Sequence, residues 1–143
     1  MKPQEFRVGN TIMCQCRGEY KPHTIKSIWH NDEDKLYCVE LDNGFQCNIN
    51  GISPIPVTEE LLLKNGFKKP KEDVFVVKDF CTVLRVTFYP KETAFELDKH
   101  SFFPSDIIET IQSNVIVLNN PTYIHTLQNI WYLLTGKELE IKL

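Results

Sequence analysis

One segment near the C-terminal end, residues 119–143, constrains the fold most because it carries the start and stop signals of a long helix. Pro121 suits the first helical position, where its missing N–H costs nothing, with Asn120 as the cap before it. Gly136 suits a left-handed cap at the end. A strand is predicted after it, over residues 138–143, where polar and apolar residues alternate. Apolar residues cluster on one side of this predicted helix: Tyr123, Leu127, Ile130, Trp131 and Leu134.

The opposite side of the predicted helix is polar but carries no charge. It contains His125, Gln128, Asn129 and Tyr132. A helix side that faces water usually carries charged residues, so this side fits contact with another element or with a partner protein better. We therefore interpret these four residues as an interaction face, covered either by the N-terminal part of the chain or by a protein partner.

Short alternating runs separated by turn signals dominate residues 1–57. Residues 11–16, 24–29, 36–41 and 45–50 each have the pattern of a strand, and Asp42-Asn43-Gly44 is a strong hairpin signal. Several short strands joined by tight turns within so few residues are typical of a small SH3-like or Tudor-like β-barrel. We predict such a barrel as the first domain, residues 1–57.

A stiff connector with prolines at alternate positions, residues 53–56, leads into the second half. Thr58 is a good N-cap for a short helix that Asn65 and Gly66 end. The β-rich runs that follow place Leu84, Val86 and Phe88 on one face, on which the apolar side of the long helix is expected to pack.

The predicted class is therefore α+β: a barrel joined by a proline hinge to an antiparallel sheet with two helices. The second domain, residues 58–143, is expected to contain a helix, strands, the long helix and a terminal strand. Residues 68–71 are interpreted as a solvated loop, and residues 98–105 as another loop. Residues 106–112 fit a short helix or a strand equally well.

Signatures of catalysis or metal binding do not occur. The histidines form no His-x-x-x-His pair, no glycine-rich phosphate loop exists, and no serine lies in a nucleophile elbow. Cys14, Cys16, Cys38 and Cys47 lack the Cys-x-x-Cys spacing of zinc sites, and most share strand faces with apolar residues. We predict no catalytic residues, no metal and no cofactor, and hence a protein that is not an enzyme.

Nucleic-acid binding is the alternative function, since small barrels often bind nucleic acid or peptide through loops and aromatic side chains. Tyr20 and Trp29 could stack on bases, with Lys21, Lys26 and Lys35 as phosphate contacts. The net charge of −3 and an acidic turn at residues 32–34 oppose this reading. The alternative interpretation of the aromatic residues is purely structural: Trp29, Tyr37 and Phe45 fill the barrel.

The chain opens on polar and charged residues rather than a signal peptide, and its longest uncharged run, residues 113–136, is interrupted by polar residues. We expect no membrane association. An odd number of cysteines without a secretion signal indicates reduced thiols in a cytoplasm, here that of a bacterial host cell.

Two stretches resemble the signatures of one family of small proteins without an assigned activity. These are PIPVTEELL followed by GF, starting at Pro54, and YIHxLQNxxYxLTGxEL, starting at Tyr123. The family recurs in genomes of gut Bacteroidetes, their prophages and their phages. The resemblance implies a fold and a genomic setting rather than a mechanism. Together with the composition, it favours a non-enzymatic interaction module with a protein partner, acting in host interaction, counter-defence or as a virion accessory.

Overall fold

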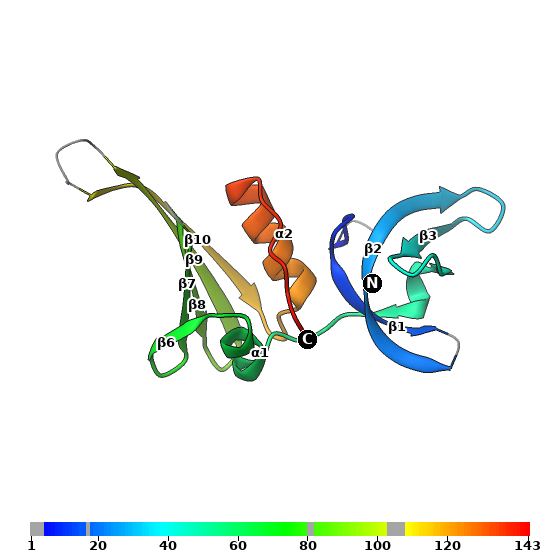
Figure 1. Cartoon of the computed structure of the whole chain (residues 1–143), viewed down its shortest axis with the longest axis horizontal. Helices are drawn as coiled ribbons and strands as arrows, with labels where there is room; N and C mark the ends of the chain where they lie inside the picture. Colours follow the sequence, from blue (N-terminus) through cyan, green and yellow to red (C-terminus); the bar gives the residue numbers. More distant parts are fainter. Residues whose placement is uncertain (1–4, 17, 80–81, 103–107) are drawn as a thin grey trace. The chain divides into compact units, whose positions relative to one another are not determined.

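Two antiparallel five-stranded sheets and two α-helices make up the described part of the chain, as expected for the mostly antiparallel α+β class. The computed structural model describes residues 5–16, 18–79, 82–102 and 108–143 (Figure 1). The described residues up to Pro56 form one compact unit together with Tyr123–Ile141, and Val57–Thr122 form the second. The sequence-based division kept the C-terminal helix with residues 58–143, whereas the structure groups it with the N-terminal strands.

The sheet of the first unit is curled because one strand serves two neighbours. The first half of β2 (Glu19–Asn31) pairs with β1 (Thr11–Cys16), and the second half pairs with β3 (Leu36–Leu41). A register shift between Ile25 and Ser27 lies at the changeover, and a bulge bends and twists a strand. With β4 (Gln46–Asn48) and β5 (Ile52–Ser53) added, the order β4-β3-β2-β1-β5 makes a curled half-barrel (Figure 1).

The interior of this half-barrel follows the predicted alternation. Ile12, Cys14 and Cys16 are all buried, which confirms that they share the inner face of β1. The predicted hairpin turn is also confirmed, since the Leu41 N–H donates to the Phe45 carbonyl at 2.9 Å. The strand expected over residues 45–50 ends early, because the Asn48 side chain accepts a hydrogen bond from the Asn50 N–H and caps a short 3-10 helix, Ile49–Gly51.

Two of the three aromatic residues expected to fill the barrel lie at its surface instead. The side chains of Trp29 and Tyr37 are 36% and 41% exposed, whereas Phe45 packs partly against the core. Trp29 pairs with Cys38, one position away from the inward-facing pair of Ile28 and Val39, so strand alternation turns it outward. Aliphatic side chains, thiols and Phe6 fill the interior.

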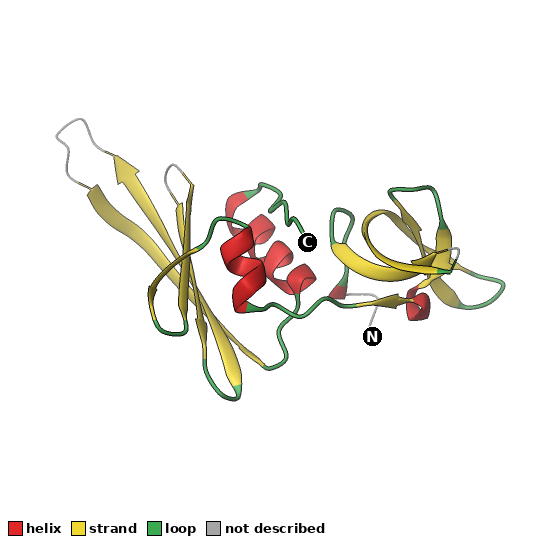
Figure 2. Ribbon diagram, turned by 60° about the horizontal axis from the view of Figure 1, so that its bottom comes forward, coloured by secondary structure: helices red, strands yellow, loops and turns green. Residues whose placement is uncertain are grey.

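The sheet of the second unit is a simple meander in the order β10-β9-β8-β7-β6, in which each strand pairs with its neighbours in sequence (Figure 2). Its strands are β6 (Lys68–Lys71), β7 (Val74–Asp79), β8 (Thr82–Phe88), β9 (Glu92–Phe102) and β10 (Ile108–Asn119). The predicted shared face of β8 is confirmed for Leu84 and Val86, which are buried, and Phe88 contacts the Phe75 ring at 5.5 Å between centroids.

Helix α1 (Glu59–Lys64) precedes this sheet and has the predicted caps. The Thr58 side chain accepts from the Leu61 N–H, and the Phe67 N–H donates to the Leu62 carbonyl at 3.0 Å after Gly66. Leu62 and Phe67 are both buried, so local hydrogen bonds and the burial of these two apolar side chains fix the ends of this helix.

Three segments differ from their sequence-based interpretation because pairing with a neighbouring strand outweighs local pattern. Residues 68–71, expected as a loop, form the edge strand β6. Residues 98–102, also expected as a loop, extend β9, and the ambiguous residues 108–112 form part of β10 opposite them. The rest of the expected loop, residues 103–105, and the start of the ambiguous segment, residues 106–107, lie outside the described residues.

Helix α2 (Ile124–Thr135) begins later than predicted. Tyr123 is its N-cap, because the preceding segment is held extended: the Ile124 N–H donates to the Ile55 carbonyl at 2.8 Å, and Pro56 bridges to Tyr123. The predicted end is confirmed by Gly136 in the left-handed conformation with φ of +71°. The terminal strand is a wrong prediction, since residues 138–143 have no strand pairing.

Candidate functional site

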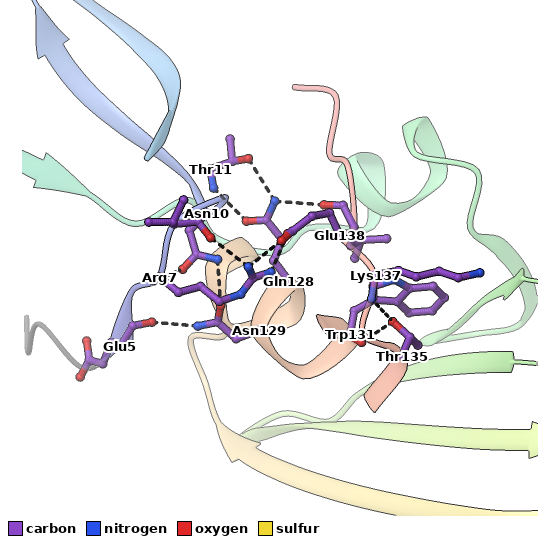
Figure 3. Close-up of polar contacts among 12 residues, drawn as sticks. Glu5, Arg7, Asn10, Thr11, Gln128, Asn129, Trp131, Thr135, Lys137 and Glu138 are labelled. Carbon is purple, nitrogen blue, oxygen red and sulfur yellow. Dashed lines mark hydrogen bonds and ion pairs between the residues drawn. The ribbon is translucent and has the colours of Figure 1, made fainter. Parts of the chain in front are cut away.

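The predicted interaction face of α2 is covered within the first unit by residues 5–11, which lead into β1 (Figure 3). His125 and Gln128 are buried, Asn129 is half-buried, and the Tyr132 side chain is 43% exposed. Of the two covers expected from the sequence, the structure therefore provides the N-terminal part of the chain. Among the four residues of this face, Tyr132 is the exposed one.

Gln128 joins three segments through its side-chain amide. Its Oε1 accepts from the Thr11 N–H at 2.8 Å, and its Nε2 donates to Thr11 Oγ1 and to the Leu139 carbonyl, both at 3.1 Å. The amide thus meets the start of β1 on one side and the C-terminal tail on the other (Figure 3). A charged side chain at this buried position would leave part of this set unpaired.

Asn129 forms a second amide link one residue later. Its Oδ1 accepts from Asn10 Nδ2 at 2.8 Å, and its Nδ2 donates to the Glu5 carbonyl at 2.9 Å. Asn10 in turn accepts from the Arg7 N–H at 2.9 Å, which closes the turn before β1. These contacts explain why the helix side carries amides and no charges: it binds backbone and amide groups of the same chain.

An ion pair closes the exposed end of this interface. The Arg7 guanidinium donates to both carboxylate oxygens of Glu138, at 2.8 and 2.7 Å, and lies 4.1 Å from the centre of the Tyr132 ring. The hydrogen bond from Arg7 holds the pKa of Glu138 below its ordinary value. Gly9 has a φ of +93°, a backbone conformation that favours glycine, and a Cβ there would also lie 3.0 Å from Glu138 Oε2.

His125 is packed as a neutral aromatic ring. Its ring centroid lies 4.5 Å from that of Phe6 and 5.7 Å from that of Tyr123, which stacks on it. Its Nδ1 is buried and has no hydrogen-bond partner. Burial lowers the pKa of His125 to about 4, against a weaker opposing effect of Glu5, so the ring is uncharged at neutral pH.

A cleft of about 500 Å³ opens at one end of the curled sheet, between the β1–β2 hairpin and the β3–β4 turn. Strand register explains which side chains line it: Glu19, Lys21 and His23 pair with Cys16, Cys14 and Ile12, whose side chains fill the inner face. The residues that line the cleft are Cys16, Glu19, Lys21, His23, Asn43, Gly44, Phe45 and Gln46.

An ion pair and a histidine–carboxylate hydrogen bond lie at the cleft walls. Lys21 Nζ lies 2.5 Å from Glu19 Oε2, and His23 Nδ1 lies 2.8 Å from Asp42 Oδ1. Burial raises the pKa of Asp42, but hydrogen bonds from His23 and from the Thr24 N–H outweigh burial, so this pKa lies below its ordinary value. The cleft therefore presents both signs of charge beside the half-buried Phe45 ring, and not a single-sign field.

The predicted nucleic-acid contacts are all exposed but are not brought together. Tyr20 pairs with Gln15 on the outer face of the hairpin, whereas Lys21 turns to the inner face and lines the cleft. Trp29 lies on the outer face of the second half of β2, Lys26 lies at its bend, and Lys35 lies in the turn beside acidic residues 32–34.

Sequence reasoning missed the cleft residues Glu19, His23 and Gln46, whereas Phe45 was already singled out as an aromatic residue of the barrel. The signal that could have found Glu19 and His23 is the hairpin around Gly18: once Ile12 and Cys16 are assigned inward, their partners across the hairpin must also face inward.

The thiols of the half-barrel are packed against one another. Cys14 Sγ lies 3.9 Å from Cys47 Sγ, and burial, helped by the neighbouring thiols, raises the pKa of Cys14 to about 12. The pKa of Cys47 is raised as well, chiefly by burial. Within the described ranges, no group of three or more His, Cys, Asp or Glu side chains is arranged to hold a metal ion. The expectation of no metal and no cofactor stays a prediction.

A second, open groove of about 670 Å³ lies in the second unit. Its cations include Arg85, whose charge is balanced by an ion pair with Glu96. The groove is lined by Gly66, Lys68, Pro70, Val76, Val77, Lys78, Val83 and Arg85.

Comparison of the chain with protein-family models, with curated proteins and with solved structures found no match. The family resemblance noted from the two signatures therefore stays a prediction. Among the helices described, neither has the length and apolar composition needed to cross a membrane.

Proposed function

We propose that this protein is a non-enzymatic binding module, and that its partner protein presents an extended peptide segment to the cleft of the half-barrel. The observation that carries this proposal is the cleft itself, about 500 Å³ in volume and walled by strands and a tight turn. Sites built on such elements hold their side chains in place, which is what recognition of a short segment requires.

The chemistry of the cleft favours a peptide over a polyanion. An ammonium group, a carboxylate and an aromatic ring lie side by side in Lys21, Glu19 and Phe45. Neighbouring side chains of a peptide can match such a mixture, whereas Glu19 and the nearby Asp42 would repel a phosphate chain. We further propose that the curled sheet is a small barrel of the SH3-like or Tudor-like kind, for which the order β4-β3-β2-β1-β5 is the main support.

Two sequence-based expectations extend this proposal. The resemblance to proteins of Bacteroidetes, their prophages and phages supports a role in host interaction, counter-defence or as a virion accessory. The expected setting is the cytoplasm of a bacterial host cell, and the partner is a protein.

The test is site-specific photo-crosslinking in a lysate of a Bacteroidetes host. A photoreactive residue replaces Gln46, which lines the cleft, and in a matched control it replaces Gln15, which is exposed on the outer face of β1. We expect a protein cross-linked at position 46 and not at position 15. The charge-reversing change Lys21→Glu should abolish the cross-link while leaving the fold intact, because this side chain is 61% exposed.

Equal labelling at positions 46 and 15 would contradict the proposal. So would a cross-link at position 46 that persists unchanged in the Lys21→Glu variant, because the cleft would then not determine recognition. A peptide taken from the captured partner should compete with the cross-link in the purified system.

Binding of single-stranded nucleic acid is the second candidate, favoured by the exposure of all five predicted contacts. Tyr20 is 58% and Trp29 is 36% exposed on strand β2, and stacking of a base on such a ring contributes about 1–3 kcal/mol. Fluorescence of Trp29 reports binding because Trp131, the other tryptophan, is buried. Titration with short DNA and RNA at low and high salt should show quenching that weakens with salt. No quenching at low salt eliminates this function.

A further inference from the structure

The two edge strands of the second unit's sheet are protected to different degrees. Strand β6 is short, and its residues Lys68, Lys69, Pro70 and Lys71 are all exposed. Lysine, proline and short length are the features with which proteins keep sheet edges from pairing with other chains. Strand β10 has 12 residues, contains no proline or glycine, and carries a single charge at Glu109.

Apolar side chains are exposed on β10 near its C-terminal end. Val115 is 62% and Val117 is 52% exposed. They pair with Glu96 and Ala94 of β9, so they lie on the face opposite to the buried Phe95. Among the residues that the structure describes, no strand pairs with the outer edge of β10. This edge therefore offers unpaired backbone groups flanked by uncovered valines.

We propose that β10 pairs with β10 of a second copy of this chain, antiparallel about a two-fold axis near Ile116. Such pairing places residues 113–119 opposite the same residues in reverse order, so Val115 meets Val117 of the second copy. This stretch contains no charge, so no like charges face each other. The same operation on β6 would bring lysines against lysines, which opposes pairing there.

One strand pair alone makes a small interface. Interfaces smaller than about 1,200 Å² are typical of weak, transient association, so the dimer should depend on concentration, with a Kd of roughly 10–100 µM. The two sheets would become one continuous sheet with β6 at both outer edges. This self-pairing does not depend on the peptide-binding proposal, because it uses only the second unit.

The first experiment is sedimentation equilibrium of the full chain. Over about 1 µM to 1 mM, the range that brackets the expected Kd, the apparent mass should rise from 16.7 kDa toward twice that value. The change Val117→Lys puts an ammonium group on each strand at the pairing centre and should weaken association at least about tenfold. The matched control is Val8→Lys, since Val8 is a 50% exposed valine of the first unit and its replacement should leave association unchanged.

Amide hydrogen exchange gives a second measurement at residue level. Backbone amides of residues 113–119 should become more protected as the concentration rises, and those of β6 should not. Circular dichroism of Val117→Lys checks that this variant is folded. A wild-type chain that stays monomeric throughout, a dimer equally strong in Val117→Lys, or protection that rises elsewhere instead of on β10 would each overturn self-pairing.

Discussion

His125 carries an ionisable ring at a position where the charged form has no support. The ring is buried between Phe6 and Tyr123, and its Nδ1 has no partner. Gln128, one helical turn later, is equally buried but uses both ends of its amide. His125 therefore packs as a neutral aromatic ring, whereas Gln128 links α2 to β1 and to the C-terminal tail through hydrogen bonds.

The free energy of unfolding should decrease as the pH is lowered through the range where His125 titrates. The unfolded ring has a pKa near 6.5 and the folded ring about 4, so between these values the unfolded chain binds the proton and the folded chain does not. The stabilising contribution is present above pH 6.5 and is lost as the pH falls toward 4, amounting to about 3 kcal/mol. Denaturant unfolding at a series of pH values measures this loss.

The matched variant for this prediction is His125→Phe, which keeps a flat ring in the same place but cannot bind a proton. Its stability should change much less between pH 7 and 4.5. Asp42 and Glu138, whose pKa values are lowered, contribute their losses below this window. An identical pH dependence in the variant and the wild type would show that another group is responsible.

Among the elements, the uncharged polar side of α2, which the sequence predicted to be covered, is the side that docks on the start of β1. The contacts are amide to backbone and amide to amide, through Gln128 and Asn129, with the ion pair of Arg7 and Glu138 at the open end. An uncharged polar helix side is therefore a signal of intramolecular docking here, and our proposal places ligand binding in the cleft of the curled sheet instead.

Replacing Gln128 by glutamate should weaken this joint without changing its size. Glutamate keeps an oxygen for the Thr11 N–H but loses the N–H groups that donate to Thr11 Oγ1 and the Leu139 carbonyl. The Thr11 hydroxyl can turn and donate to the carboxylate, but the Leu139 carbonyl can only accept. A buried carboxylate facing that carbonyl should cost about 2–3 kcal/mol of unfolding free energy. Thermal unfolding of Gln128→Glu measures the cost.

The control Gln15→Glu, at an exposed position of β1, should stay within about 0.5 kcal/mol of the wild type. Equal effects of the two changes would mean that the amide contacts are not stabilising.

At the scale of the whole molecule, the first unit is built from both ends of the sequence. The described residues up to Pro56 and Tyr123–Ile141 belong to it, while the meander lies between them in the chain. Residues 1–57 are therefore not the whole first unit, because α2 also belongs to it and lies far from them in the sequence.

The fragment of residues 1–57, which matches the sequence-based first domain, should be less stable than the same residues in the full chain. It lacks α2, so the Thr11 N–H and the Asn10 amide lose their partners. Two-dimensional NMR should show its β1 signals broadened or absent, and adding a peptide of residues 121–143 should restore dispersed signals. A fusion of the two segments through a flexible linker serves as the covalent control. A fragment that is fully folded alone and unaffected by the peptide would contradict this assignment.

Features that depend only on neighbouring residues could be predicted from the sequence. These include the inner face of β1 with Ile12 and Cys14, the turn ending at Gly44, the Thr58 cap and the left-handed cap at Gly136, because alternation and backbone dihedrals are local properties. Tertiary structure decided the features that depend on distant partners. Residues 98–102 form a strand because β10 lies opposite them. In residues 138–143, the Leu139 carbonyl and the Lys142 N–H bond to the side-chain amides of Gln128 and Asn65 instead of to a neighbouring strand. Contacts between distant residues also grouped α2 with the N-terminal strands and placed Phe45 in one cleft with Glu19 and His23.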